Sequence, residues 1–178
     1  PAGDNGPMTT THLAAAHASH PRPTGAAFDV ILLLHVLCVV IGLGTVLVSG
    51  VQAGRLRRAA DGPLPEGLCE YFAPGANWAG RALYGVPVFG FVLLGMARGA
   101  YGLGDGWVLE GLALWALAAL GAEGFLWPAE RRVQAGLAGD GGEGPSVEIR
   151  QECRTISWMA IALVLVLVLA TVLMVVQP

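Results

Sequence analysis

Hydrophobic residues fill four long stretches of the chain, and polar, glycine- and proline-rich segments separate them. Each stretch is close to the roughly 20 residues that a helix needs to cross a bilayer. The pattern predicts an all-α protein, a four-helix transmembrane bundle, with spans at about 28-52, 78-97, 107-127 and 158-176. We expect these spans to form one domain over residues 26-178, after a disordered, histidine-containing tail at 1-25.

The segments between the spans set the expected helix ends. The first span should lead into an arginine-rich loop at 52-67, whose prolines and glycines stop the helix. Pro128 should close the third span, because proline lacks a backbone N–H group. A flexible loop is expected at 135-146, and the polar residues 147-157 favour a helical lead-in that continues into the fourth span.

The arginines indicate how the bundle is oriented. Loops on the cytoplasmic side of membrane proteins carry an excess of basic residues. The loops after the first and third spans are rich in arginine, whereas the loop after the second contains only Arg98 and the N-terminal tail only Arg22. We therefore expect both termini on the outer side of a cell membrane, with the lipid bilayer as the first partner of this multi-pass protein.

Composition supports a membrane protein and excludes several other classes. Of 178 residues, 54% are hydrophobic and only 13% charged, whereas soluble domains carry about 25% charged residues. No basic patch indicates nucleic-acid binding, and no phosphate-binding loop, metalloprotease motif or nucleophile elbow is present. We expect a non-enzymatic binding, transport-associated or accessory subunit. Four spans in so small a chain would form a transporter only as a homo-oligomer or within a larger membrane complex.

The first span carries a stripe of small and polar residues. His35, Cys38, Gly42, Thr45 and Ser49 follow one another at steps of three or four, which places them on one face of a helix. Such a face meets other helices in membrane proteins. It also carries the one histidine within the predicted spans.

A group of ionisable residues is expected near the outer surface. With about 1.5 Å of rise per residue, His35 lies roughly 10 Å below the outer end of the first span and Glu110 roughly 5 Å below that of the third. Arg98 ends the second span on the same side, and Cys38 shares the face of His35. Two interpretations stay open: a ligand or proton site, which includes a proton-coupled carrier, or polar contacts that only orient helices.

A second charged pair is expected near the inner surface. Arg81 lies in the first turn of the second span, and Glu123 lies one turn before the end of the third. The two are level and opposite in charge. We predict a structural ion pair whose side chains reach toward the interface.

No cofactor is predicted, but haem or copper is the alternative. Membrane haem commonly takes two axial ligands, and the spans contain no second histidine, only Met96 or Met159 as conceivable partners. His35 and Cys38 share a face, yet two ligands do not complete a zinc or copper site. The alternative function is a haem- or metal-dependent membrane redox protein that uses His35.

Three short segments carry a resemblance to known proteins: LLHVLCVVIGLG at 33-44, YFAPGAN at 71-77 and EGFLWPAERRVQ at 123-134. Together they resemble a family of bacterial four-span membrane proteins of uncharacterised function, which implies a bacterial inner membrane. More distantly, a first-helix histidine followed by glycine resembles the copper-resistance membrane domain and the four-helix bacterial protoporphyrinogen oxidase. The chain departs from that oxidase in having no lysine and no aromatic residue between His35 and Gly42, which argues against its activity.

Overall fold

The computed structural model describes residues 25–59, 62–73, 75, 78–97, 100–139 and 145–176. Over these residues the chain is helical and forms no strand. Four of its helices are long and apolar enough to cross a membrane, which confirms the all-α class and the four predicted spans. The predicted disordered tail at 1-25 lies outside the described residues, except for Gly25.

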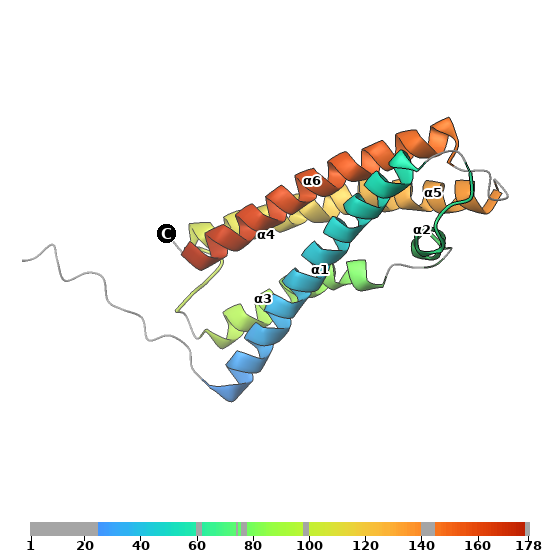
Figure 1. Ribbon diagram of the computed structural model, residues 1–178. Coiled ribbons are helices and arrows are strands. Elements are labelled where there is room, and N and C mark those ends of the chain that lie inside the picture. Colours follow the sequence, from blue (N-terminus) through green and yellow to red (C-terminus); the bar gives the residue numbers. More distant parts are fainter. Residues whose placement is uncertain are drawn as a thin grey trace, which may run out of the picture.

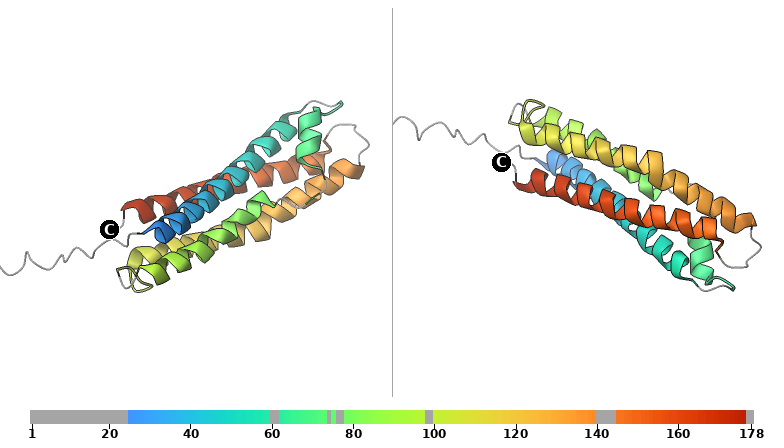
Figure 2. Two further views of the ribbon diagram at one scale, coloured as in Figure 1. Left: turned by 90° about the horizontal axis from the view of Figure 1, so that it is seen from below. Right: turned by 90° about the horizontal axis from the view of Figure 1, so that it is seen from above.

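The helices form an elongated bundle (Figure 1). In chain order they are α1 (Ala26–Arg58), α2 (Glu66–Tyr71), the short 3-10 turn η2 (Ala79–Arg81), α3 (Ala82–Met96), α4 (Gly106–Gly121), the π-helical turn η3 (Ala122–Leu126), α5 (Trp127–Gly139) and α6 (Val147–Val176). Helices α4 and α5 run on from each other as one rod beside α6, and the start of α1 lies at the same end of the bundle as the end of α6 (Figure 2).

Helix α1 extends further than the sequence predicted. The loop expected from residue 52 begins only after Arg58. Gly54 does not end the helix, and Ala53 and Leu56 beside it are fully buried. At the helix end Arg150 of α6 donates hydrogen bonds from Nη1 to the carbonyl oxygens of Arg57 and Ala59, at 3.2 and 3.1 Å. These bonds satisfy carbonyls that have no partner within the helix.

The prediction that Pro128 closes the third span is wrong. The helix continues through α5 to Gly139, so the first part of the loop predicted at 135-146 is helical as well. Proline removes one backbone donor and its ring presses on the carbonyl four residues earlier. The wider π-helical turn η3 directly precedes it, and such a turn accommodates an extra residue within a helix.

Three of the helical rods are longer than a bilayer is thick, and their additional length lies at one end of the bundle. With about 1.5 Å of rise per residue, α1 is about 50 Å long, the α4–α5 rod about 51 Å and α6 about 45 Å. The hydrocarbon core of a bilayer is about 30 Å thick. As predicted, the polar residues 147-157 are helical and continuous with α6. They extend the bundle beyond the spans at the end where the arginines gather.

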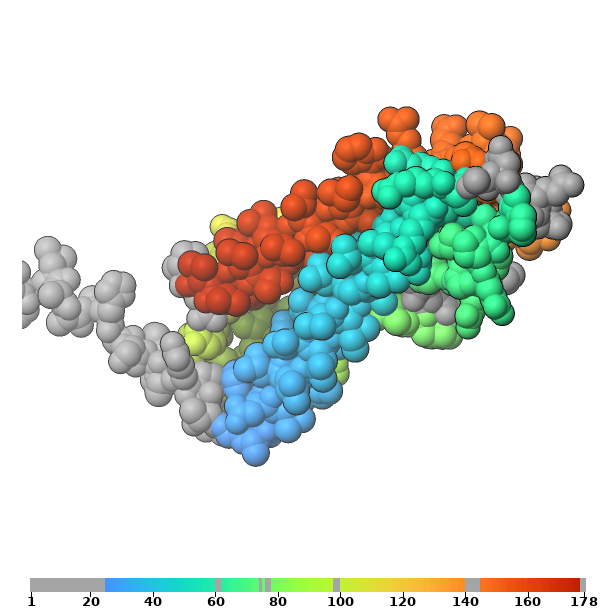
Figure 3. Space-filling model, viewed as in Figure 1, coloured from blue at the N-terminus to red at the C-terminus, as the bar shows by residue number. Residues whose placement is uncertain are grey.

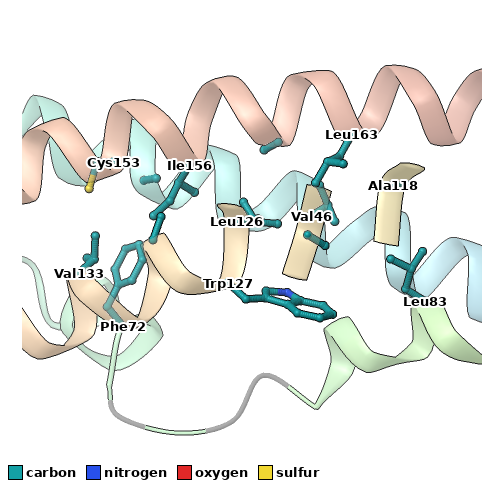
Figure 4. Packing of buried hydrophobic residues seen from close by; sticks show 14 of the residues in the cluster. Val46, Phe72, Leu83, Ala118, Leu126, Trp127, Val133, Cys153, Ile156 and Leu163 are labelled. Carbon is teal, nitrogen blue, oxygen red and sulfur yellow. The ribbon is translucent and has the colours of Figure 1, made fainter. Parts of the chain in front are cut away.

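We distinguish two halves of the bundle. The terminal half comprises the described residues within 26–41, 84–117 and 165–176, and the arginine-rich half those within 42–83 and 118–164. The seven largest fully buried side chains all belong to the arginine-rich half: Phe72, Leu56, Leu126, Ile156, Val133, Cys153 and Ser49. Figure 4 shows several of them between α1, α5 and α6. The hydrophobic core therefore sits at the arginine-rich end.

Small residues of α1 bring its neighbours close: Gly42 of the predicted stripe toward α3, and Gly50, which lies outside the stripe, toward α6. A Cβ atom at Gly42 would lie 3.5 Å from the backbone of Leu83 in α3. On the side toward α6, a Cβ atom at Gly50 would lie 2.6 Å from that of Ala160. The hydroxyl of Ser157 in α6 also donates to the Gly50 carbonyl at 3.4 Å. Close backbone approach of this kind is typical of membrane helices.

Candidate functional site

A cavity of about 410 Å³ lies in the terminal half, between α1, α3, α4 and α6. Helix α1 packs closely on α3 and α6, and α4 packs on α6, but α3 and α4 touch each other only lightly, so the space between them stays open. In the space-filling view a hollow separates the terminal ends of α1 and α6 (Figure 3). Small-molecule sites have volumes of about 300–1,000 Å³ and mainly apolar walls, and this cavity meets both conditions.

His35 lines this cavity from α1. Its Nδ1 lies 2.9 Å from the carbonyl oxygen of Val86 in α3, and the side chain is half-buried. The ring lies against Gly90, where a Cβ atom would come within 3.5 Å of its Cε1. A carbonyl oxygen only accepts hydrogen bonds, so Nδ1 carries the proton in this contact.

Pro87 in the middle of α3 explains a second side-chain contact at the cavity. Because proline has no N–H group, the carbonyl of Leu83, four residues earlier, loses its partner within the helix. Trp115 of α4 donates to this carbonyl from Nε1 at 2.9 Å. Neighbouring helices commonly satisfy the backbone groups that a proline frees in a membrane helix. The two contacts tie α1 and α4 to α3 across the cavity.

Helix α6 and the α3–α4 connection complete the cavity wall. Thr171 lines it, but its hydroxyl donates to the carbonyl of Leu167 in its own helix at 2.8 Å. Met174 lines the same space. Tyr101 and Trp107 also contribute, with their rings edge to face and their centroids 5.6 Å apart. The wall is therefore apolar with few polar groups.

The residues that were predicted to gather near the outer surface do not all lie at the cavity. Cys38 is half-buried one turn from His35, and a Cβ atom at Gly85 of α3 would lie 2.5 Å from its Sγ. Glu110 is exposed on α4 and is not among the residues that line the cavity. Arg98 lies outside the described residues. His35 and Cys38 thus both face α3.

Arg81 and Glu123 both lie close to Tyr84, but each makes its contact with an aromatic residue: Glu123 with Tyr84, and Arg81 with Trp127. The hydroxyl of Tyr84 donates to the Glu123 carboxylate. The guanidinium of Arg81 lies 5.5 Å from the ring centroid of Trp127, within the range of a cation–π contact. Among the described residues the ion pair that the structure shows is Arg132–Glu152, at 2.7 Å.

A buried polar cluster lies in the arginine-rich half. Ser49 and Glu130 are only 2% and 6% exposed, and the hydroxyl of Ser49 donates to the Glu130 carboxylate. The hydroxyl groups of Ser49 and Tyr71 lie 2.7 Å apart. Burial raises the pKa of Tyr71, the bond to Ser49 opposes this rise, and the Glu130 charge adds to it. The cluster therefore joins α1, α2 and α5.

Reasoning from sequence placed Ser49 on the packing face but missed Glu130 and Trp115. Glu130 was expected to follow the helix, because Pro128 was expected to end it. Its spacing was a usable signal, since Trp127, Glu130 and Val133 follow at steps of three and all are buried. For Trp115, the signal was a proline in a helix, which requires a donor from a neighbouring helix.

No family model, curated protein or solved structure matches the chain. Within the part of the chain that the structure describes, no group of three or more His, Cys, Asp or Glu side chains could hold a metal ion. A haem or metal ion at His35 would need a further ligand that is not part of such a group, for example a methionine sulfur.

Proposed function

We propose that this chain is a non-enzymatic protein of a bacterial inner membrane that binds a lipid-soluble small molecule in the cavity beside His35. The observation that carries the proposal is the cavity itself: about 410 Å³, apolar, and lined by residues of α1, α3, α4 and α6. A tightly packed bundle would contain no such space, because protein interiors normally pack at the density of organic crystals.

The walls favour an apolar, uncharged ligand. Among the described residues, those that line the cavity include His35 but no Asp, Glu or Arg side chain. A charged group in such a place would lose its hydration without gaining a partner. A molecule that partitions into the bilayer would reach the cavity between α1 and α6 directly from the lipid. Such binding agrees with a transport-associated or accessory role, alone, as a homo-oligomer, or within a larger membrane complex.

Filling the cavity tests this function. Ala170 of α6 lines the cavity, and Ala162 is exposed on another part of the same helix. We expect Ala170→Phe to abolish the binding of a hydrophobic phenol such as 4-octylphenol, followed by the fluorescence of the tryptophans in the cavity wall. The matched variant Ala162→Phe should bind as the wild type does. Equal binding by both variants would contradict the proposal.

The orientation is part of the same proposal. The arginine-rich half faces the cytoplasm and both termini face outward, as the positive-inside rule indicates. Cys69 on α2 is exposed, whereas Cys153 is buried. A membrane-impermeant maleimide should label Cys69 in inverted membrane vesicles and leave it unlabelled in intact spheroplasts. Labelling in the spheroplasts alone would reverse the orientation.

A haem- or metal-dependent redox function is the second candidate, and one observation favours it. Histidines that ligate metals usually donate their other ring nitrogen to a carbonyl or carboxylate, as His35 does toward Val86. His35 Nε2 and the Met174 sulfur, which line the same cavity, are the groups that would hold the iron of a haem. When bound, haem would supply one-electron chemistry. A stoichiometric Soret band that disappears in His35→Ala would support this candidate over the first.

A further inference from the structure

We infer that the ligand of the cavity ends in a hydroxyl group, and that Nε2 of His35 accepts a hydrogen bond from it. The inference rests on the proposed function, since it requires that the cavity hold a small molecule. It adds the chemical class of that molecule: a neutral, lipid-soluble alcohol or phenol.

His35 adopts the tautomer with the proton on Nδ1. Nδ1 lies 2.9 Å from the Val86 carbonyl oxygen, so Nδ1 must be the donor. In a neutral imidazole only one nitrogen carries a proton, and the bond made by one nitrogen fixes the state of the other. Nε2 of the neutral ring is therefore an acceptor. Within the described part of the chain, the hydrogen bond of His35 is the one from Nδ1, and no side chain or backbone group donates to Nε2.

Two other polar groups of the wall already donate their protons within the protein. Trp115 already donates its Nε1 proton to Leu83, and the Thr171 hydroxyl donates to Leu167. Neither can offer that proton to a ligand as well, whereas the Tyr101 hydroxyl and the Trp107 Nε1–H group, whose residues also line the cavity, can still donate to the oxygen of a ligand. His35 thus presents an acceptor in apolar surroundings, and a ligand that cannot donate would leave this acceptor unpaired, which is costly. A carbonyl, an ether or a carboxylate end cannot donate, whereas an alcohol or phenol can.

Pro87 contributes to this arrangement. It frees the Leu83 carbonyl for Trp115, which holds α4 to α3 at one side of the cavity. On the other side the Val86 carbonyl holds the ring of His35 against Gly90. The glycine leaves room for the ring, and the backbone of α3 fixes its orientation.

A pair of ligands that differ in one proton tests the inference. We would compare 4-octylphenol with its methyl ether, 4-octylanisole, on the full chain in detergent at pH 8, where an ordinary imidazole is neutral. The phenol should bind about tenfold more tightly, the ratio expected for one hydrogen bond of ordinary strength. In His35→Leu the two affinities should become equal. Thr45→Val, which changes a threonine of α1 that does not line the cavity and whose hydroxyl donates to the Gly42 carbonyl, should keep the preference.

The possible failures are distinguishable. If neither compound binds the wild type, the proposed function fails, and the inference with it. If both bind equally well, or if the preference for the phenol persists in His35→Leu, the cavity binds ligands but the inference is wrong.

A spectroscopic measurement covers the case in which His35→Leu does not fold. Nitrogen-15 NMR of the histidine-labelled wild type should show Nδ1 protonated and Nε2 unprotonated for the ring that the phenol perturbs, with His35→Gln for assignment. A protonated Nε2 on that ring would overturn the inference.

Discussion

The two halves of this bundle use the same helices but pack them in opposite ways. In the arginine-rich half, α1, α5 and α6 enclose a dense core in which Leu56, Leu126 and Ile156 are almost fully buried. In the terminal half the same α1 and α6 diverge, and a cavity of about 410 Å³ stays open between the helices. Hydrophobic residues are abundant in both halves, so hydrophobicity alone does not explain the difference.

The surroundings of each half explain it. With the orientation proposed above, the ends of α1 and α5 and the start of α6 extend beyond the bilayer, because these helices exceed its thickness of about 30 Å. There water drives apolar side chains together. Within lipid this driving force is absent, and helices associate through close packing and hydrogen bonds instead. An apolar space can therefore persist in the terminal half, where backbone contacts hold α1 and α4 to α3.

The largest effect should come from truncating matched leucines in the two halves. Leu126→Ala opens a void in the closed core and should lower the free energy of unfolding by about 3 kcal/mol. Leu112→Ala only enlarges a cavity that already exists, so it should cost less than about 1 kcal/mol. Equilibrium unfolding in one detergent measures both. Equal losses would show that the halves are packed alike.

The next largest effect concerns two glycines of α1, one that packs against α6 and one with open space beside it. At Gly50 a methyl group would meet the Cβ atom of Ala160, which cannot move without its backbone. Gly50→Ala should therefore destabilise the protein by about 2 kcal/mol. At Gly44 nothing lies within 4 Å of the added atom, and alanine should stabilise the helix by about 0.5 kcal/mol. Shifts of the same sign in thermal unfolding would contradict this.

The smallest effect is expected at the polar cluster that anchors α2. Tyr71→Phe removes the hydrogen bond to Ser49 and should cost about 1 kcal/mol at pH 8. Because burial raises the pKa of Tyr71 above its ordinary value of 10.0, the folded state favours the neutral phenol. The stability that the protein gains from the neutral Tyr71 phenol is fully present below pH 10 and is lost as the pH rises through the raised pKa. The difference between wild type and variant should stay constant below pH 10 and shrink as the pH rises above 10, and a difference that is constant throughout would argue against it.

Much of the fold was predictable from the pattern of residues, because crossing a bilayer is a property of single segments. The four spans, the packing face of α1 and the helical lead-in to α6 all follow from length, hydropathy and spacing. His35 was also identified from sequence, as a histidine within a span. That it lines a cavity could not be foreseen, since the other walls come from α3, α4 and α6.

The sequence by itself determined which segments become helices and which of their faces are small or polar. Only the tertiary structure decided where those helices end and what their polar groups contact. Pro128 was compatible with a helix end, but the π-helical turn before it and the packing of α5 on α6 carry the helix onward and bury Glu130. Likewise, Pro87 frees the Leu83 carbonyl by its own chemistry, but Trp115 of another helix supplies the donor. Hydrogen-bond partners distant in sequence depend on how helices pack, and local pattern does not encode that packing.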